Sequence, residues 1–169
     1  MRAYVYGFSL LELMMVIAII AILSLVALPG VPDKFVRDQI VDAVKLADVA
    51  KTPVTLSWAL TATLPVNNTA AGLPAANLIV NNYISSVAVE SGAIQITFGN
   101  HANANIQGKV LTFRPGVVVG SPIVPVAWVC GNAEPPVNMT AMGLNRTNLA
   151  LKYLPINCRS SGAASTAGT

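Results

Sequence analysis

Residues 8–28 read FSLLELMMVIAIIAILSLVAL, and this stretch decides what kind of protein the chain encodes. It contains one charged residue, Glu12, and is otherwise dominated by Met, Ile, Leu and Ala. A helix of this length spans about 31 Å, close to the thickness of about 30 Å of the hydrocarbon core of a membrane. The stretch therefore predicts a helix that is apolar on all sides and buries itself in lipid or in other protein.

This apolar helix has two possible fates: removal as a signal peptide, or retention in the working protein. The residues before it contain one basic residue, Arg2, and the apolar run is longer than the core of a typical signal peptide. No pair of small residues marks a cleavage site after Leu28, where the chain continues PGVP. These features favour a retained helix that crosses the membrane once.

Glu12 is the unusual residue of the stretch. A carboxylate costs about 2.5–3.5 kcal/mol at the middle of a membrane and less near its edge. Because Glu12 lies one helical turn inside the run, its side chain can reach the head-group region. Alternatively, the carboxylate awaits a cationic partner. Composition alone leaves both interpretations open.

The composition of the whole chain bounds its function. The chain has 169 residues, enough for one ordinary domain, and 54% of them are apolar while 10% are charged. The usual charged share is about 25%, so a disordered protein is excluded. A net charge of +3 does not indicate nucleic acid as the main partner. One His and two Cys provide too few ligands for a zinc site or a Cys-His nucleophile, and no catalytic or cofactor-binding motif is present.

The apolar run leads into an amphipathic segment. Apolar residues recur there at spacings of three, four or seven, which predicts one long helix from about residue 8 to about residue 60. Opposite charges three or four apart support its exposed face, where a solvated surface is the simplest interpretation. These pairs are Asp33–Arg37, Lys34–Asp38, Asp42–Lys45 and Asp48–Lys51. Pro29, Pro32 and Pro53 each remove a helical hydrogen bond and are expected to bend or loosen the helix.

The remainder of the chain carries turn and strand signals. Residues 61–82 are rich in small polar residues and read as a loop. Alternating patterns predict strands at 85–90, 93–98, 109–114 and 126–130, and Ser91-Gly92 predicts a hairpin turn between the first two. The fold class is therefore α+β, a long N-terminal helix packed on an antiparallel sheet of about four strands.

The N-terminal residues form a specific motif. It consists of Gly7 and Phe8 after a very short leader, Glu12 four residues after the Phe, and then the unbroken apolar run. This motif, and the order of helix, loop, strands and cysteine-closed C-terminal segment, resembles the type IV pilins of bacteria. Pro29 matches a helix proline common in that family. Pro32 departs from the family pattern, and the helix is either bent or broken there.

The resemblance implies a division of the chain and a processing step. Residues 1–7 are the leader that prepilin peptidase removes by cutting between Gly7 and Phe8, and Phe8 is then N-methylated. Residues 8–60 are the long helix, of which 8–28 serve first as a membrane anchor and then as filament core. Residues 61–169 are the globular head, with a low-complexity tail at 160–169 that we expect to be mobile.

Cys130 and Cys158 are expected to pair. An exported chain reaches an oxidising compartment, where two cysteines that enclose 27 residues favour a disulfide over two unrelated thiols. The enclosed segment has little strand pattern, which suggests that it needs this tether. In the pilin family such a segment is exposed and takes part in adhesion or in subunit contacts.

The function implied by the resemblance is that of a structural subunit of a type IV pilus, without enzymatic activity or cofactor. Its partners are other copies of the chain, prepilin peptidase, the pilus assembly machinery and inner-membrane lipid. It is stored in the bacterial inner membrane and then assembled into an extracellular filament used for adhesion, twitching motility or DNA uptake, so nucleic acid stays open as a partner. The alternatives are a pseudopilin of a type II secretion system, a minor pilin, and a membrane-anchored extracytoplasmic binding protein.

Overall fold

The computed structural model describes residues 7–27 and 31–160 of the chain. The chain divides into two compact units that meet between Phe35 and Val36. Helix α1 (Leu10–Ala27) belongs to the first unit, and the sheet belongs to the second. The predicted leader residues 1–6 and the predicted tail beyond Ser160 lie outside the described residues.

Helix α1 is apolar around its whole circumference. Its side chains from Leu10 to Ser24 are exposed within this unit, and the hydroxyl of Ser24 donates to the carbonyl of Ile20 at 2.7 Å. That bond satisfies the polar atom inside the helix itself, which is what an apolar environment requires. Among the described residues, however, no helix is long and apolar enough to cross a membrane, so the predicted span at residues 8–28 is not confirmed.

Helix α2 (Val31–Thr61) follows α1 after residues 28–30, which are not described. One helix from about 8 to 60 was predicted, and the described residues show two; the predicted bend at Pro29 falls between them. Pro32 lies in the first turn of α2, where a missing backbone N–H costs no helical hydrogen bond. Pro53 lies inside α2 and leaves the carbonyl of Val49 without its helical donor, and Val49 is exposed to solvent.

Four strands form the antiparallel sheet in the order β1-β2-β3-β4, and a fifth short strand pairs with β3. Their bounds are β1 Ile84–Glu90, β2 Ala93–Phe98, β3 Val110–Val117, β4 Ala127–Cys130 and β5 Thr140–Ala141. The predicted hairpin turn is confirmed: Ser91 and Gly92 join β1 to β2 and both have positive φ, as a type I′ turn requires. The α+β fold class is confirmed as well.

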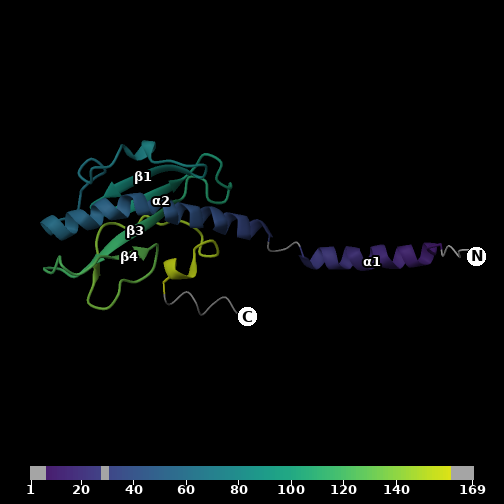
Figure 1. The fold of residues 1–169 in the computed structure, drawn as a ribbon. Helices are drawn as coiled ribbons and strands as arrows, with labels where there is room; N and C mark the ends of the chain where they lie inside the picture. The colour runs from purple at the N-terminus through teal and green to yellow at the C-terminus, as the bar shows by residue number, and fades with distance from the viewer. Residues whose placement is uncertain (1–6, 28–30, 161–169) are drawn as a thin grey trace, which may run out of the picture. The chain divides into compact units, whose positions relative to one another are not determined.

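The core of the head lies between α2 and one face of this sheet, as Figure 1 shows. Alternate residues of each strand point to that face, including Ile94, Ile96 and Phe98 of β2, which are fully buried. The predicted stripe of α2 supplies the opposite side of the core: Val36, Ile40, Ala47, Val54 and Trp58 are buried and Val44 is partly buried. Ala43 and Ala50, which were not predicted, join them. On the exposed side of α2, the predicted pairs Asp42–Lys45 and Asp48–Lys51 form at 3.3 and 2.8 Å.

Strand β3 extends three residues beyond its predicted end because Pro115 is tolerated there. The carbonyl of Pro115 accepts a hydrogen bond from the amide of Met142, so this residue faces β5 and its missing N–H removes no bond to β4. Strand β5 was not predicted, since two residues carry no strand pattern. Its pairing with Gly116 and Val117 continues the ladder past the end of β2.

The free edge of β1 is covered by side chains of the preceding loop. Asn68, which is buried, accepts from the amide of Val89 at 2.6 Å and donates to the carbonyl of Val87 at 3.0 Å. Asn81 accepts from the amide of Ile84 at 2.9 Å farther along the same edge. The two asparagines thus occupy positions that another strand would otherwise take, which blocks edge-to-edge pairing here.

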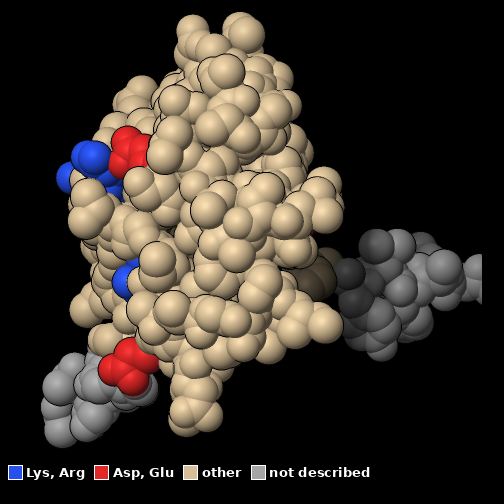
Figure 2. Space-filling model, turned by 90° about the vertical axis from the view of Figure 1, so that its left-hand side faces the viewer, with Lys and Arg blue, Asp and Glu red and all other residues tan. Residues whose placement is uncertain are grey.

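Charged side chains are sparse on the head. No Lys, Arg, Asp or Glu occurs between Lys51 and Glu90, or between Arg114 and Glu134. Figure 2 shows one face of the molecule on which a few charged patches interrupt an otherwise uncharged surface. A surface of this kind costs little to desolvate, which suits contacts with other protein.

Candidate functional site

The predicted processing residues lie just before α1. Gly7 and Phe8 are exposed and non-helical, and the phenyl side chain of Phe8 is 77% exposed. The first described backbone bond of the helix runs from the amide of Leu13 to the carbonyl of Ser9 at 3.1 Å. The peptide bond between Gly7 and Phe8 therefore joins two exposed, non-helical residues just ahead of α1.

Glu12 lies in the first turn of α1 and is exposed within this unit. The N-terminal end of a helix carries a partial positive charge, so a carboxylate is better placed in this turn than farther along the helix. Glu12 forms no ion pair within the part of the chain that the structure describes.

The predicted Cys130–Cys158 disulfide is formed, with the two Cα atoms 4.6 Å apart. Cys130 ends β4 and Cys158 ends the 3-10 helix η2 (Ile156–Cys158), and both are buried. The amide of Asn132 donates to the carbonyl of Cys158 at 2.9 Å, directly beside the disulfide. The bond thus joins the sheet to the last described turn of the chain.

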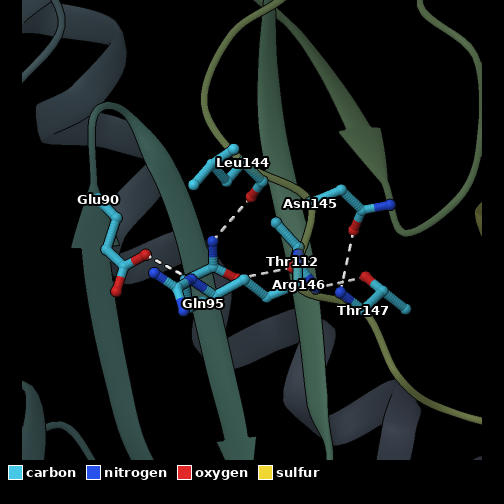
Figure 3. A network of polar contacts seen from close by, with 7 residues as sticks. All are labelled: Glu90, Gln95, Thr112, Leu144, Asn145, Arg146 and Thr147. Atoms are coloured by element: carbon cyan, nitrogen blue, oxygen red, sulfur yellow. Dashed lines mark hydrogen bonds and ion pairs between the residues drawn. The ribbon is translucent and has the colours of Figure 1, made fainter.

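The segment between the cysteines is attached to the sheet through residues 140–148, by contacts that the sequence did not predict. Figure 3 shows part of this attachment on the face of the sheet opposite α2. The Gln95 side chain donates to the carbonyl of Leu144 at 2.9 Å, and the hydroxyl of Thr112 donates to Gln95 at 2.6 Å. The amide of Arg146 donates to the same Thr112 hydroxyl at 2.9 Å.

Two further side chains of this segment complete the edge of β3 where β4 has ended. The amide of Thr112 donates to the hydroxyl of Thr147 at 3.0 Å, and the amide of Val110 donates to the side chain of Asn148 at 2.7 Å. In return, the amide of Asn148 donates to the carbonyl of Val110 at 3.1 Å. Side chains here replace strand partners, as Asn68 and Asn81 do at β1.

Arg37 connects the beginning of the head to the same C-terminal segment. Its guanidinium donates twice to the carbonyl of Lys152, from Nε at 3.1 Å and from Nη2 at 2.8 Å. Close by in the sequence, Leu149, Tyr153 and Leu154 are buried in the core. The bonds from Arg37 tie α2, where it enters the head, to the C-terminal segment.

These polar attachments were not predicted from the sequence, because no local sequence pattern indicates them. Glu90 illustrates this: its partner is Arg146, at 2.7 Å, from a segment 56 residues away. Both side chains are about half exposed, so this pair is expected to contribute little stability. Among residues 7–27 and 31–160, no three His, Cys, Asp or Glu side chains gather into a group that could hold a metal ion.

Two family models match the chain. A model of the pilins, which form bacterial filaments, covers residues 36–159, and a model of the prokaryotic N-terminal methylation motif covers residues 2–28. The first range holds the described head from Val36 to Arg159. The second range includes Gly7, Phe8 and Glu12.

Several relatives match the chain over most of its length. The type IV major pilin protein PilE1 of Neisseria gonorrhoeae is 37% identical over 164 residues, which cover 94% of this chain and 89% of the relative. A fimbrial protein of Neisseria meningitidis serogroup A is 36% identical over 170 residues, covering 94% and 96%. The fimbrial protein EcpC of Eikenella corrodens is 34% identical over 156 residues, covering 90% of both chains.

The matches span both the methylation motif and the head, and they agree with the α+β architecture and the disulfide. Pilins are structural subunits of filaments and do not form an enzyme family. The chain therefore belongs to the type IV pilin family and is a structural subunit of a bacterial pilus.

Proposed function

We propose that the chain is made as a precursor, cleaved between Gly7 and Phe8, N-methylated at Phe8, and polymerised through its apolar helix. The observation that carries this proposal is that Gly7 and Phe8 are exposed and non-helical directly ahead of an all-round apolar helix, which has Glu12 in its first turn. Residues 1–7 are then the leader, and residues 61–169 are the head that decorates the filament.

Before assembly, the precursor is stored in the inner membrane with its head outside the cytoplasm. The sequence of residues 8–28 supports this storage, because only Glu12 interrupts its apolar character. During assembly, identical helices replace lipid around α1. A heterologous contact that does not close into a ring produces a helical filament. Adhesion, motility and DNA uptake are the uses that we propose for this filament.

Within the filament, the carboxylate of Glu12 pairs with the N-terminal amine of Phe8 on an adjacent subunit. Cleavage creates this amine, so the cation becomes available only in the mature protein. A buried ion pair need not give net stability, but a subunit in the wrong register would leave both charges buried and unpaired, at a cost of several kcal/mol. The pair therefore sets the register of assembly.

The experiment compares the variants Glu12→Val and Glu12→Asp with a matched control, Leu13→Val, at the next position. The pilin content of sheared filaments is measured against the pilin content of membranes. We expect Glu12→Val to be cleaved normally and to lower the filament yield by about tenfold or more. Glu12→Asp should be intermediate because its shorter arm reaches less well, and Leu13→Val should assemble normally. A normal yield from cleaved Glu12→Val would refute the assembly role of the carboxylate.

A further inference from the structure

We propose that residues 140–148, here called the docked segment, keep their place on the sheet without the Cys130–Cys158 bond. The disulfide then orders only the residues next to its two ends. The C-terminal part of the head thus consists of two separately held pieces, although one covalent loop encloses most of it.

The first argument is the periodicity of the attachment. Every second residue from Met142 to Asn148 makes one backbone hydrogen bond to the sheet. The amide of Met142 donates to the carbonyl of Pro115 at 2.9 Å, and the carbonyl of Leu144 accepts from the Gln95 side chain at 2.9 Å. The amide of Arg146 donates to the hydroxyl of Thr112 at 2.9 Å, and the amide of Asn148 donates to the carbonyl of Val110 at 3.1 Å. This repeat of two residues is that of an extended chain, and strand β5 begins it.

The second argument is the burial of the two side chains beneath the docked segment. Gln95 is 4% exposed and Thr112 is fully buried, so water does not compete for their hydrogen bonds. Gln95 uses both its amide nitrogen and its oxygen, and the hydroxyl of Thr112 both donates and accepts. Gly143 lies so close to Ala93 that an added Cβ would be 2.6 Å from the Cβ of Ala93, which shows how tightly the segment lies on β2.

The third argument is that the docked segment is separated along the chain from both cysteines, although one exposed side-chain bond, from the side-chain amide of Asn145 to the side-chain oxygen of Asn132 at 2.9 Å, links it to the turn after Cys130. Toward Cys158, the buried residues Leu149, Tyr153 and Leu154 and the bonds from Arg37 to the carbonyl of Lys152 intervene. Toward Cys130, residues 134–139 intervene, and they are mostly exposed. A displacement of the disulfide therefore reaches residues 140–148 through this exposed side-chain bond, while the buried bonds of Gln95 and Thr112 hold the segment to the sheet. The disulfide still stabilises the fold as a whole by restricting the unfolded chain.

The test is hydrogen exchange measured by mass spectrometry on the full-length chain in detergent micelles. The variant Cys130→Ala/Cys158→Ala removes the disulfide. We expect peptides covering 142–148 to exchange within about twofold of the wild-type rate. Peptides covering 131–133 and 155–159 should exchange at least about tenfold faster. Faster exchange at 142–148, alone or together with the β1–β2 peptides, would overturn the proposal.

A second arm keeps the disulfide and weakens the docking. Thr112→Val removes the hydroxyl that bonds Gln95 and the amide of Arg146, with little change of shape. It should accelerate exchange at 142–148 by about tenfold and leave 155–159 unchanged. The matched control is Thr97→Val: Thr97 lies on β2, on the same face of the sheet as Thr112, and its hydroxyl makes no bond within the described part of the chain. Unchanged exchange at 142–148 in Thr112→Val would also overturn the proposal.

Discussion

In this head, individual asparagine and threonine side chains make hydrogen bonds to strands that the backbone of a neighbouring strand usually makes. Asn68 is the clearest example, because its amide group meets the amide of Val89 and the carbonyls of Val87 and Pro74. All three bonds are to backbone groups that are otherwise without a strand partner. Removing such a side chain leaves buried donors and acceptors unsatisfied, which costs more than the bonds themselves.

We expect Asn68→Ala to lower the free energy of unfolding by about 2–4 kcal/mol, because three hydrogen bonds at the edge of β1 are lost. Asn67→Ala is the matched control: Asn67 is exposed, and its side chain accepts one bond, from the amide of Ala70. That change should cost less than about 1 kcal/mol. Urea denaturation followed by circular dichroism measures both. Equal losses in the two variants would show that Asn68 does not secure the edge.

At the scale of elements, the packing of α2 on the sheet holds the head together. We expect Ile40→Ala to destabilise the head by about 2–5 kcal/mol, since Ile40 is fully buried and its loss leaves a cavity. Val41→Ala, one position along the same helix, changes an exposed side chain and should have an effect within about 0.5 kcal/mol. Thermal unfolding of the two variants tests this prediction. Similar melting temperatures would contradict the assignment of Ile40 to the buried face of α2 and Val41 to the exposed face.

Regular elements could be predicted from sequence because their patterns are local. The spacing of Val36, Ile40 and Ala47 revealed the buried stripe of α2, and Ser91-Gly92 revealed the β1–β2 hairpin. Strand β5 and the edge-covering asparagines could not be found in this way, because their partners are distant in sequence and no periodicity is involved. The polar attachments of residues 140–148 could not be predicted for the same reason, since they arise only in the folded molecule.

At the scale of the whole molecule, the motif at Gly7, Phe8 and Glu12 could be recognised from sequence. The structure adds that all three residues are exposed, with Gly7 and Phe8 just before α1 and Glu12 in its first turn. Glu12 forms no ion pair within residues 7–27 and 31–160, and its pairing with an adjacent subunit stays a prediction. Cys130 and Cys158 were predicted to pair, and the structure confirms the pair. What the isolated chain cannot supply is the environment of its apolar helix.

We expect pilin sheared from cells to consist of residues 8–169 with one added methyl group on the amine of Phe8. The physical reason is that the Gly7–Phe8 bond is the open junction ahead of the apolar helix. Intact-mass measurement, with N-terminal sequencing of the same sample, checks this outcome. A Gly7→Leu variant is the control, because a bulky side chain at the cut site should leave the leader attached. Retention of Met1 in the native filament protein would refute the cleavage.

The exposed connection at residues 134–139 offers a site where a foreign peptide can be inserted into the pilin. Its residues lie between two fixed points, the turn after Cys130 and strand β5, and Val137 at its centre is 89% exposed. Its own backbone bond, from Met139 to the carbonyl of Pro136, closes a local turn and crosses to no other element. Lengthening such a connection costs only about 0.6 kcal/mol for each doubling of its length. A foreign peptide inserted after Val137 would consequently leave the sheet and the docked segment in place and be repeated on every subunit of a filament, as a dense array of antigen.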